Sequence, residues 1–237
     1  MELDYIIDTH THTIASGHAS NTILEMAKAA SENGIKILGI TDHAKTMPDS
    51  SGDAYFINLK SVDREAYGVE LLLGVELNII GYNGEIDLPI SILNEMDIVI
   101  ASFHTNCLTP GTKEENTNAL IKCCENPLIH IIGHPDDGNY ELDMRRVVKA
   151  AKETGTLLEL NNNSMLFRKN ARENDKKMLV ICKEENCPII IGSDAHTVEK
   201  VGQNSNAMEL VEEVGFPKEL IINYYPDKFK EYIEKNR

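Results

Sequence analysis

The sequence predicts an α/β fold in which seven mainly parallel strands and their helices form a barrel. Short runs rich in Ile, Val and Leu alternate with longer amphipathic segments, which is typical of βαβ units. The 237 residues are enough for one such barrel, and no linker-like segment or internal repeat divides them, so we expect a single domain over residues 1–237. With 42% hydrophobic and 26% charged residues, the composition is that of a folded globular protein.

Each predicted element follows from its local pattern. The strand candidates are the apolar runs at 3–7, 36–41, 70–79, 98–103, 129–133, 157–160 and 189–192. Helices are predicted where apolar residues recur at three- and four-residue spacing, at 22–33, 113–124, 143–153, 171–184 and 206–214. Right-handed crossovers between this many parallel strands tend to close into a barrel, here one unit short of the usual eight. The segment 44–61 is the main long irregular loop, and we expect it to cover the site.

The charge and the termini limit the classes of partner and location. A formal net charge of −15 disfavours long nucleic acid, because such binding relies on Lys and Arg to neutralise phosphates, whereas it favours cations. The segment Met1-Glu2-Leu3-Asp4 lacks the features of a signal peptide, and no apolar stretch reaches 18 residues, so we expect a cytoplasmic protein without a membrane span. Five cysteines without CxxC spacing predict reduced thiols rather than disulfides or a thiolate zinc site.

Histidines and carboxylates stand at the ends of six predicted strands. The carboxyl ends of parallel strands meet on one face of a barrel, so these side chains should meet there. His10 and His12 are two residues apart in an extended segment and point the same way, and Asp194 and His196 repeat this spacing. A lone histidine after a strand is more often a surface or capping residue, and His130, inside an apolar run, is interpreted as structural. The candidate metal ligands are His10, His12, His18, His43, Glu76, His104, His134, Asp194 and His196.

The ligand types narrow the choice of metal. Imidazole nitrogens and carboxylate oxygens without thiolates suit catalytic zinc, iron or manganese. At about three or four protein ligands per ion, the candidates would hold two or three ions with open coordination positions. Such a centre is suited to hydrolysis.

Six motifs, taken in order, resemble the PHP (polymerase and histidinol phosphatase) family, and in particular its stand-alone, short-chain phosphatase branch, across nearly the whole chain. They are Asp8-Thr9-His10-Thr11-His12 followed by His18, Ile40-Thr41-Asp42-His43, Gly74-Val75-Glu76, Ser102-Phe103-His104, Gly133-His134-Pro135 and Gly192-Ser193-Asp194-Ala195-His196. The resemblance implies a distorted, TIM-like (β/α)7 barrel and three divalent metal ions, zinc being the first expectation and iron or manganese the alternatives. It implies three ligand sets: His10, His12, Glu76 and Asp194; Glu76, His104 and His134; and His18, His43 and His196.

The predicted function is hydrolysis of a small phosphorylated substrate, a phosphomonoester, by attack of a metal-activated hydroxide. Asp194 and His196 are predicted to act in catalysis, Asp194 by moving protons. Arg168 is predicted either to bind the substrate phosphate or to be an ordinary surface arginine. Asp8 and Asp42 precede metal-site histidines and are expected either to orient them or to cap turns.

Three alternatives stay open. Two are enzymes on the same fold, a histidinol-phosphate phosphatase and a nuclease-type phosphodiesterase. The third is a metal-binding regulatory module without turnover. The sequence does not decide the physiological substrate, the native metal, the oligomeric state or the group that protonates the leaving alcohol.

Overall fold

The computed structural model describes residues 5–234 and contains two sheets, in the order β1-β2-β4-β3 and β5-β6-β7-β8-β9. Among the described strands only β3 pairs in the antiparallel sense, with β4. The strands are β1 (Ile7–Asp8), β2 (Ile37–Ile40), β3 (Glu65–Ala66), β4 (Val69–Leu73), β5 (Val75–Asn78), β6 (Val99–Ser102), β7 (Ile131–Ile132), β8 (Leu157–Asn161) and β9 (Ile189–Gly192). The prediction of an α/β fold with mainly parallel strands is confirmed.

The strand predicted at 70–79 is observed as two strands that belong to different sheets. β4 pairs with β2, whereas β5 pairs with β6. The break falls at Gly74, where a Cβ atom would lie 2.0 Å from the carbonyl oxygen of Ile98. The chain therefore crosses between the sheets at a position with no room for a side chain. The strand predicted at 3–7 begins outside the described residues, and its observed counterpart is β1.

The outer strands of the two sheets, β1 and β9, are joined by the segments that follow them and by side chains, among them that of Asn223. Thr11 and Ala195 form a parallel bridge. The Asn223 side chain accepts a hydrogen bond from the Ile191 amide at 2.8 Å and donates to the carbonyl oxygens of Ile191 and Ile7, at 2.7 and 2.8 Å. Asn223 thus replaces part of a strand ladder between β1 and β9. Because the strands are divided into two sheets, the seven-stranded barrel stays a prediction.

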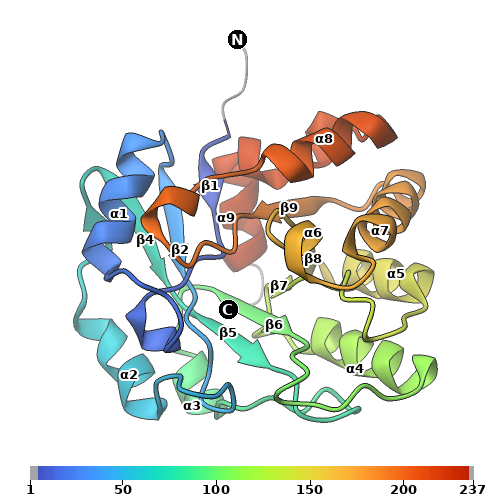
Figure 1. Ribbon diagram of the computed structural model, residues 1–237, viewed down its shortest axis with the longest axis horizontal. Helices are drawn as coiled ribbons and strands as arrows, with labels where there is room; N and C mark the ends of the chain where they lie inside the picture. Colours follow the sequence, from blue (N-terminus) through green and yellow to red (C-terminus); the bar gives the residue numbers. More distant parts are fainter. Residues whose placement is uncertain (1–4, 235–237) are drawn as a thin grey trace.

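The helices lie mostly around the outside of the strands (Figure 1). They are α1 (Ile23–Glu32), α2 (Asp53–Asn58), α3 (Ile90–Leu93), α4 (Lys113–Glu125), α5 (Met144–Thr154), α6 (Ser164–Phe167), α7 (Ala171–Glu185), α8 (Ser205–Val214) and α9 (Pro226–Glu234). The five predicted helices correspond to α1, α4, α5, α7 and α8. Capping boxes begin α1 and α4, formed by Thr22 with Glu25 and by Thr112 with Glu115. None of the helices in the described part of the chain is long and apolar enough to cross a membrane.

The prediction of one irregular loop over 44–61 is wrong for its second half. Residues 53–61 form α2 and the 3₁₀ helix η2 (Leu59–Ser61). Phe56 and Leu59 are buried in the main hydrophobic core. This burial stabilises a helix that is too short to be read from periodicity.

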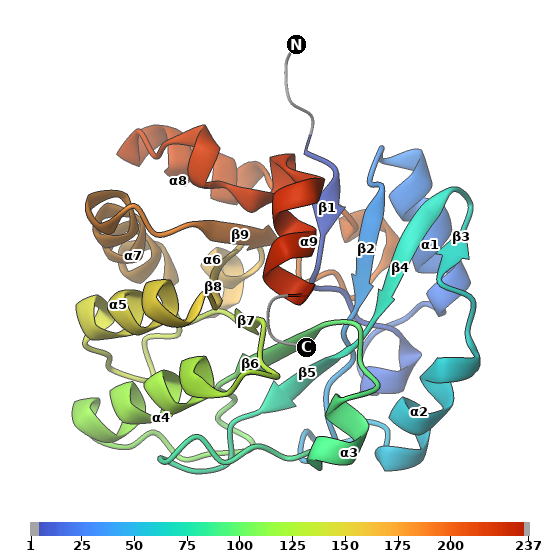
Figure 2. The ribbon, with the colours of Figure 1, turned by 180° about the vertical axis from the view of Figure 1, so that it is seen from behind.

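A second, smaller core fills the space between the amino ends of the strands. It contains Ile7, Ile37, Leu72, Ile98, Ile100, Ile131, Leu157, Ile190, Ile222 and Phe229. Phe229 belongs to α9, which lies in front of the strands in Figure 2. The α9 helix therefore covers the end of the strands opposite to the end that carries the histidines.

Candidate metal centre

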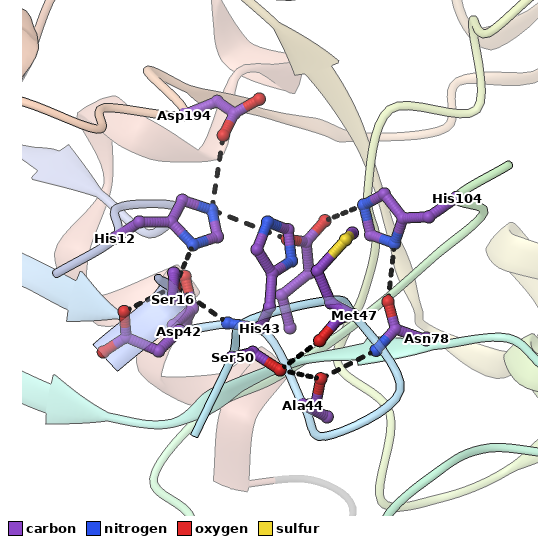
Figure 3. Close-up of polar contacts among 12 residues, drawn as sticks. His12, Ser16, Asp42, His43, Ala44, Met47, Ser50, Asn78, His104 and Asp194 are labelled. Carbon is purple, nitrogen blue, oxygen red and sulfur yellow. Dashed lines mark hydrogen bonds and ion pairs between the residues drawn. The ribbon is translucent and has the colours of Figure 1, made fainter. Parts of the chain in front are cut away.

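The nine predicted ligands lie together at the carboxyl ends of the strands, around the fully buried Glu76 of β5. Five histidine nitrogens face its carboxylate. His43 Nδ1 lies 2.7 Å, His10 Nε2 3.4 Å and His12 Nε2 3.5 Å from Oε2, and His134 Nε2 lies 2.8 Å and His104 Nε2 3.4 Å from Oε1. Figure 3 shows His12, His43 and His104 turned toward one common space.

Asp194 lies on the other side of this space. Its Oδ1 is 3.3 Å from His12 Nε2 and 3.5 Å from His196 Nδ1. The outermost pair is His18 and His196, whose Nε2 atoms are 3.0 Å apart. His18 is exposed, so the cluster runs from the buried Glu76 to the surface.

Hydrogen bonds on the far side of three rings set their tautomers. His10 Nδ1 lies 2.7 Å from Glu159 and His104 Nδ1 2.8 Å from the Asn78 side-chain oxygen, so both nitrogens donate. His12 Nδ1 lies 3.0 Å from Ser16 Oγ. Because the Ser16 hydroxyl donates its proton to Asp42, it accepts the hydrogen bond from His12 Nδ1. In all three rings the Nε2 lone pair therefore points into the cluster, the arrangement in which histidine binds a metal.

The residues present fit a group of divalent cations. The Nε2 atoms of His10, His12 and His104 and the Oε2 atom of Glu76 are buried, and within the described residues they have no hydrogen-bond partner. Two ligands about 2.1 Å from one tetrahedral ion are about 3.4 Å apart. The separations of 3.3–3.5 Å between these nitrogens and the carboxylates match this value.

Three groups of ligand atoms, each within 4.8 Å, stand out among the described residues: His10, His12 and Glu76; His43, Glu76 and His104; and His12, His43 and His196. The first contains three members of one set implied by the resemblance. The other two join His43 to Glu76 and His12 to His196, which the resemblance assigns to different ions. The groups therefore share members, and the division among ions is not fixed by this geometry.

The electrostatics keep the cluster in the form that binds cations. Burial lowers the pKa of His12 well below its usual range, and it lowers the pKa of His104 to about 3. Burial raises the pKa of Glu76, but His43, His10 and His104 outweigh this effect and hold it well below its usual range. The pKa of Asp194 is likewise lowered, because His10, His12 and Arg168 outweigh burial. The His12 and His104 rings are therefore neutral beside ionised carboxylates. Burial also lowers the pKa of His10, but Glu159, Glu76 and Asp194 outweigh this effect and raise it well above its usual range.

Arg168 follows α6 and reaches the same site. Its Nη1 atom lies 3.0 Å from Ser164 Oγ and 3.5 Å from Asp194 Oδ2. A cleft of about 390 Å³ opens over the cluster and is lined by His18, His43, Met47, Pro48, Asp49, His104, Asn106, Arg168, Asp194 and His196. The cleft combines a cation with the candidate ligands, and its size suits a small anion.

The two aspartates that precede histidines have different surroundings. Asp42 accepts hydrogen bonds from Thr13, Ser16 and Tyr55, and it reaches His12 through the Ser16 hydroxyl. Asp8 accepts from the amides of Ser193 and Gly202 and holds the chain after β9. His130 packs against β6, where its Nδ1 accepts from the Val99 amide at 3.0 Å.

Glu159 was missed by the sequence reasoning, although it touches two candidate ligands. It lies in β8, is fully buried, and contacts the His10 ring and the His134 amide. Every residue of this strand is buried. A carboxylate inside such an apolar strand is the sequence signal that could have identified it.

Comparison with known proteins gives concordant matches. A family model described as "PHP domain" matches residues 8–214. A protein of Acetivibrio thermocellus named "Probable phosphatase" is 45% identical over 235 residues, which cover 99% of this chain and 98% of that protein. The fold is similar to that of a histidinol phosphate phosphatase from Lactococcus lactis subsp. lactis Il1403, whose structure is complexed with zinc, L-histidinol and phosphate. The TM-score is 0.58 at 16% sequence identity, and the match covers 90% of this chain and 95% of that one. A chain in an archaeal ribonuclease P with mature tRNA has a TM-score of 0.59 at 14% identity, over 97% of this chain and 90% of that one.

Proposed function

The chain belongs to the PHP domain family, and from this premise we propose that it is a metal-dependent phosphatase that hydrolyses small phosphomonoesters. The observation that carries the proposal is a set of buried histidine Nε2 atoms around Glu76 that have no hydrogen-bond partner among residues 5–234. A small cleft beside Arg168 opens over them. The name of the Acetivibrio relative supports the reaction class.

We propose three divalent metal ions, most simply zinc, held by the nine predicted ligands. Zinc is supported by the histidine-rich, thiolate-free donor set and by the zinc in the Lactococcus structure. His10, His12, Glu76 and Asp194 would hold one ion, Glu76, His104 and His134 a second, and His18, His43 and His196 a third. The overlap of the observed groups supports ions that share ligands.

The mechanism assigns distinct work to the chain's own residues. When bound, divalent ions supply a hydroxide at neutral pH and neutralise phosphoryl charge. Arg168 would bind a phosphate oxygen through its planar fork and hold the phosphorus in the cleft. Asp194, at the inner side of the cleft, would accept a hydrogen bond from the attacking water, whose proton would leave to solvent past His196, at the outer side. Because a metal-activated hydroxide would be the nucleophile, no side chain is assigned this role.

We further propose that the two sheets form one distorted, seven-stranded barrel. The Thr11–Ala195 bridge and the bonds of Asn223 between β1 and β9 support closure. The continuity of β4 and β5 through Gly74 supports counting them as one strand. Closure would explain why ligands from both sheets meet.

The test is metal analysis and phosphatase assay on the same preparation. We expect two to three metal ions per chain, and turnover of a chromogenic phosphomonoester that is lost on chelation and restored by zinc or manganese. Glu76→Gln controls for contaminating phosphatases and should lower turnover by more than the roughly 10–100-fold typical of changes behind a ligand. A fully loaded protein without turnover would favour the regulatory module.

The substrate decides between the enzymatic alternatives. The fold is shared with both a histidinol phosphate phosphatase and a ribonuclease P chain, so it does not select a substrate. Small phosphomonoesters, histidinol phosphate and a short single-stranded oligonucleotide should be assayed side by side. A net charge of −15 and the small cleft favour the small substrates. Preference for the oligonucleotide would reject the phosphatase proposal.

A further inference from the structure

We propose that Glu159 is a positioning residue that aims two metal ligands, His10 by its ring and His134 by its backbone. The inference rests on the proposed metal centre. Glu159 belongs to β8, a strand from which no predicted ligand comes. Its two carboxylate oxygens divide the work between the two histidines.

The first oxygen fixes the His10 ring. Glu159 Oε1 lies 2.7 Å from His10 Nδ1, and both side chains are completely buried. Because a carboxylate only accepts hydrogen bonds, it holds the proton on Nδ1 and leaves Nε2 as a lone pair directed at Glu76 and Asp194. The hydrogen bond also sets the rotation of the ring.

The second oxygen fixes the backbone that carries His134. Glu159 Oε2 accepts a hydrogen bond from the His134 amide at 2.9 Å. His134 has a φ of 29°, a backbone conformation that residues with a side chain seldom adopt. The charged hydrogen bond helps to hold this strained residue, and the strained backbone directs the ring to within 2.8 Å of Glu76.

Neighbouring residues leave room for the Glu159 carboxylate and donate hydrogen bonds to it. At Gly192, in β9, a Cβ atom would lie 2.0 Å from Glu159 Oε1 and 2.9 Å from His10 Cβ. Asn161 donates a third hydrogen bond to Oε2, at 3.1 Å. Burying a carboxylate costs several kcal/mol unless donors surround it, and here every donor comes from the metal centre or its border.

Glutamine at this position cannot satisfy both donors. Its oxygen can accept from His10 or from His134, but the amide nitrogen then faces the other donor. Glu159→Gln keeps the volume and loses one of the two bonds. Glu159→Asp keeps the charge, but it is one methylene shorter and draws back from His10.

The experiment measures zinc binding directly, apart from turnover. Native protein, Glu159→Gln and Glu159→Asp are titrated with zinc against a competing chelator, and zinc content is determined after loading. The matched control is Asp175→Asn, since Asp175 is equally buried but has no hydrogen-bond partner among the described side chains. We expect about 10–100-fold weaker binding of at least one zinc in both Glu159 variants and unchanged affinity in the control.

A spectroscopic measurement on the native protein needs no variant. Nitrogen NMR of histidine-labelled, zinc-loaded protein should show the His10 proton on Nδ1, in a strong hydrogen bond. Native zinc affinity in a folded Glu159→Gln protein, or His10 protonated on Nε2, would overturn the inference. A protein that binds zinc without hydrolysing phosphomonoesters would instead reject the proposed function and leave the Glu159 comparison valid. A native protein that binds no zinc would reject both.

Discussion

At the scale of single residues, phosphate binding in the cleft should depend on the planar guanidinium group of Arg168. Arg168 is held by Ser164 and Asp194, so its position relative to the candidate ligands is set before a substrate arrives. Lysine keeps the charge but not the planar fork that matches two phosphate oxygens. With alanine at this position, Asp194 would also lose a cationic neighbour that stabilises its ionised form.

We therefore expect Arg168→Lys to raise KM for a phosphomonoester more than it lowers kcat. Arg168→Ala should reduce kcat/KM by about 10–100-fold, the equivalent of one charged hydrogen bond. Steady-state kinetics at fixed metal concentration measures both. Arg145→Lys is the control, because Arg145 pairs with Glu184 and Glu185 on the surface. Equal losses in the two arginine-to-lysine variants would make Arg168 an ordinary surface arginine.

The location of the candidate ligands on one side of the fold could be predicted from the sequence because parallel strands end on the same side. His43 and His104 lie within three residues of the ends of β2 and β6, and this rule needs no knowledge of side-chain contacts. Glu159 could not be reached by that rule, since it lies inside its strand and its importance depends on the 2.7 Å contact with His10. The role of Ser16 between Asp42 and His12 is hidden for the same reason.

At the scale of elements, the last residue of β9, Gly192, has no room for a side chain. Gly192 has an ordinary φ, so alanine would be excluded by contact with Glu159 and His10 rather than by backbone strain. We expect Gly192→Ala to lower the free energy of unfolding by about 1–3 kcal/mol. Zinc binding should weaken as well, since Glu159 must move.

Urea unfolding and zinc titration check this expectation against Gly52→Ala. A Cβ atom at Gly52 would meet no atom of the described residues within 4 Å, and the φ of Gly52 is also ordinary. Gly52→Ala should therefore leave zinc affinity unchanged. If Gly192→Ala also left stability and zinc affinity unchanged, β9 would be able to shift and make room for the added methyl group.

A buried carboxyl group in α7 should make stability depend on pH. Burial raises the pKa of Asp175 well above its usual range, Asp136 and Glu159 add to the effect, and Arg168 opposes it. The folded protein thus keeps a proton that the unfolded chain releases. Stability from this group is complete below the pKa of the unfolded state, and it is lost as the pH rises toward the pKa of the folded state.

Asparagine cannot ionise, so Asp175→Asn should be more stable than the native protein at neutral pH. The difference should shrink by about 1.4 kcal/mol per pH unit on acidification and disappear near pH 4. Urea unfolding of both metal-free proteins between pH 4 and 8 measures it. A difference that does not change with pH would contradict a raised pKa and indicate a packing effect.

Elements with long periodic patterns were predictable, whereas those defined by tertiary contacts were not. α7 and α8 match within one residue because their patterns extend over several turns. α2 has only six residues and depends on the burial of Phe56. The division of 70–79 depends on Ile98, whose carbonyl oxygen approaches Gly74.

At the scale of the whole molecule, the candidate ligands join the two sheets. His10 and His43 follow strands of the first sheet, and Glu76, His104 and His134 belong to or follow strands of the second. A further link, through Asn223, was not predictable, because a side-chain amide that joins two strands leaves no periodic pattern. Bound ions would therefore hold the sheets together at one end, and α9 covers the other.

Metal removal should consequently lower the unfolding temperature of the whole protein. Ligands that bind only the native state stabilise it by about 2.7 kcal/mol at 100 times the dissociation constant, which corresponds to about 5–10 °C for a chain of this size. Calorimetry of zinc-loaded and chelated protein measures the difference. Phe229→Ala, in the second core at the other end of the strands, should destabilise the zinc-loaded and the chelated protein by about 3–5 kcal/mol each. The difference in unfolding temperature between the two forms should stay the same. If chelation removes the bound zinc but leaves the unfolding temperature unchanged, the ions do not connect the sheets, and Asn223 and the strand contacts must hold them alone.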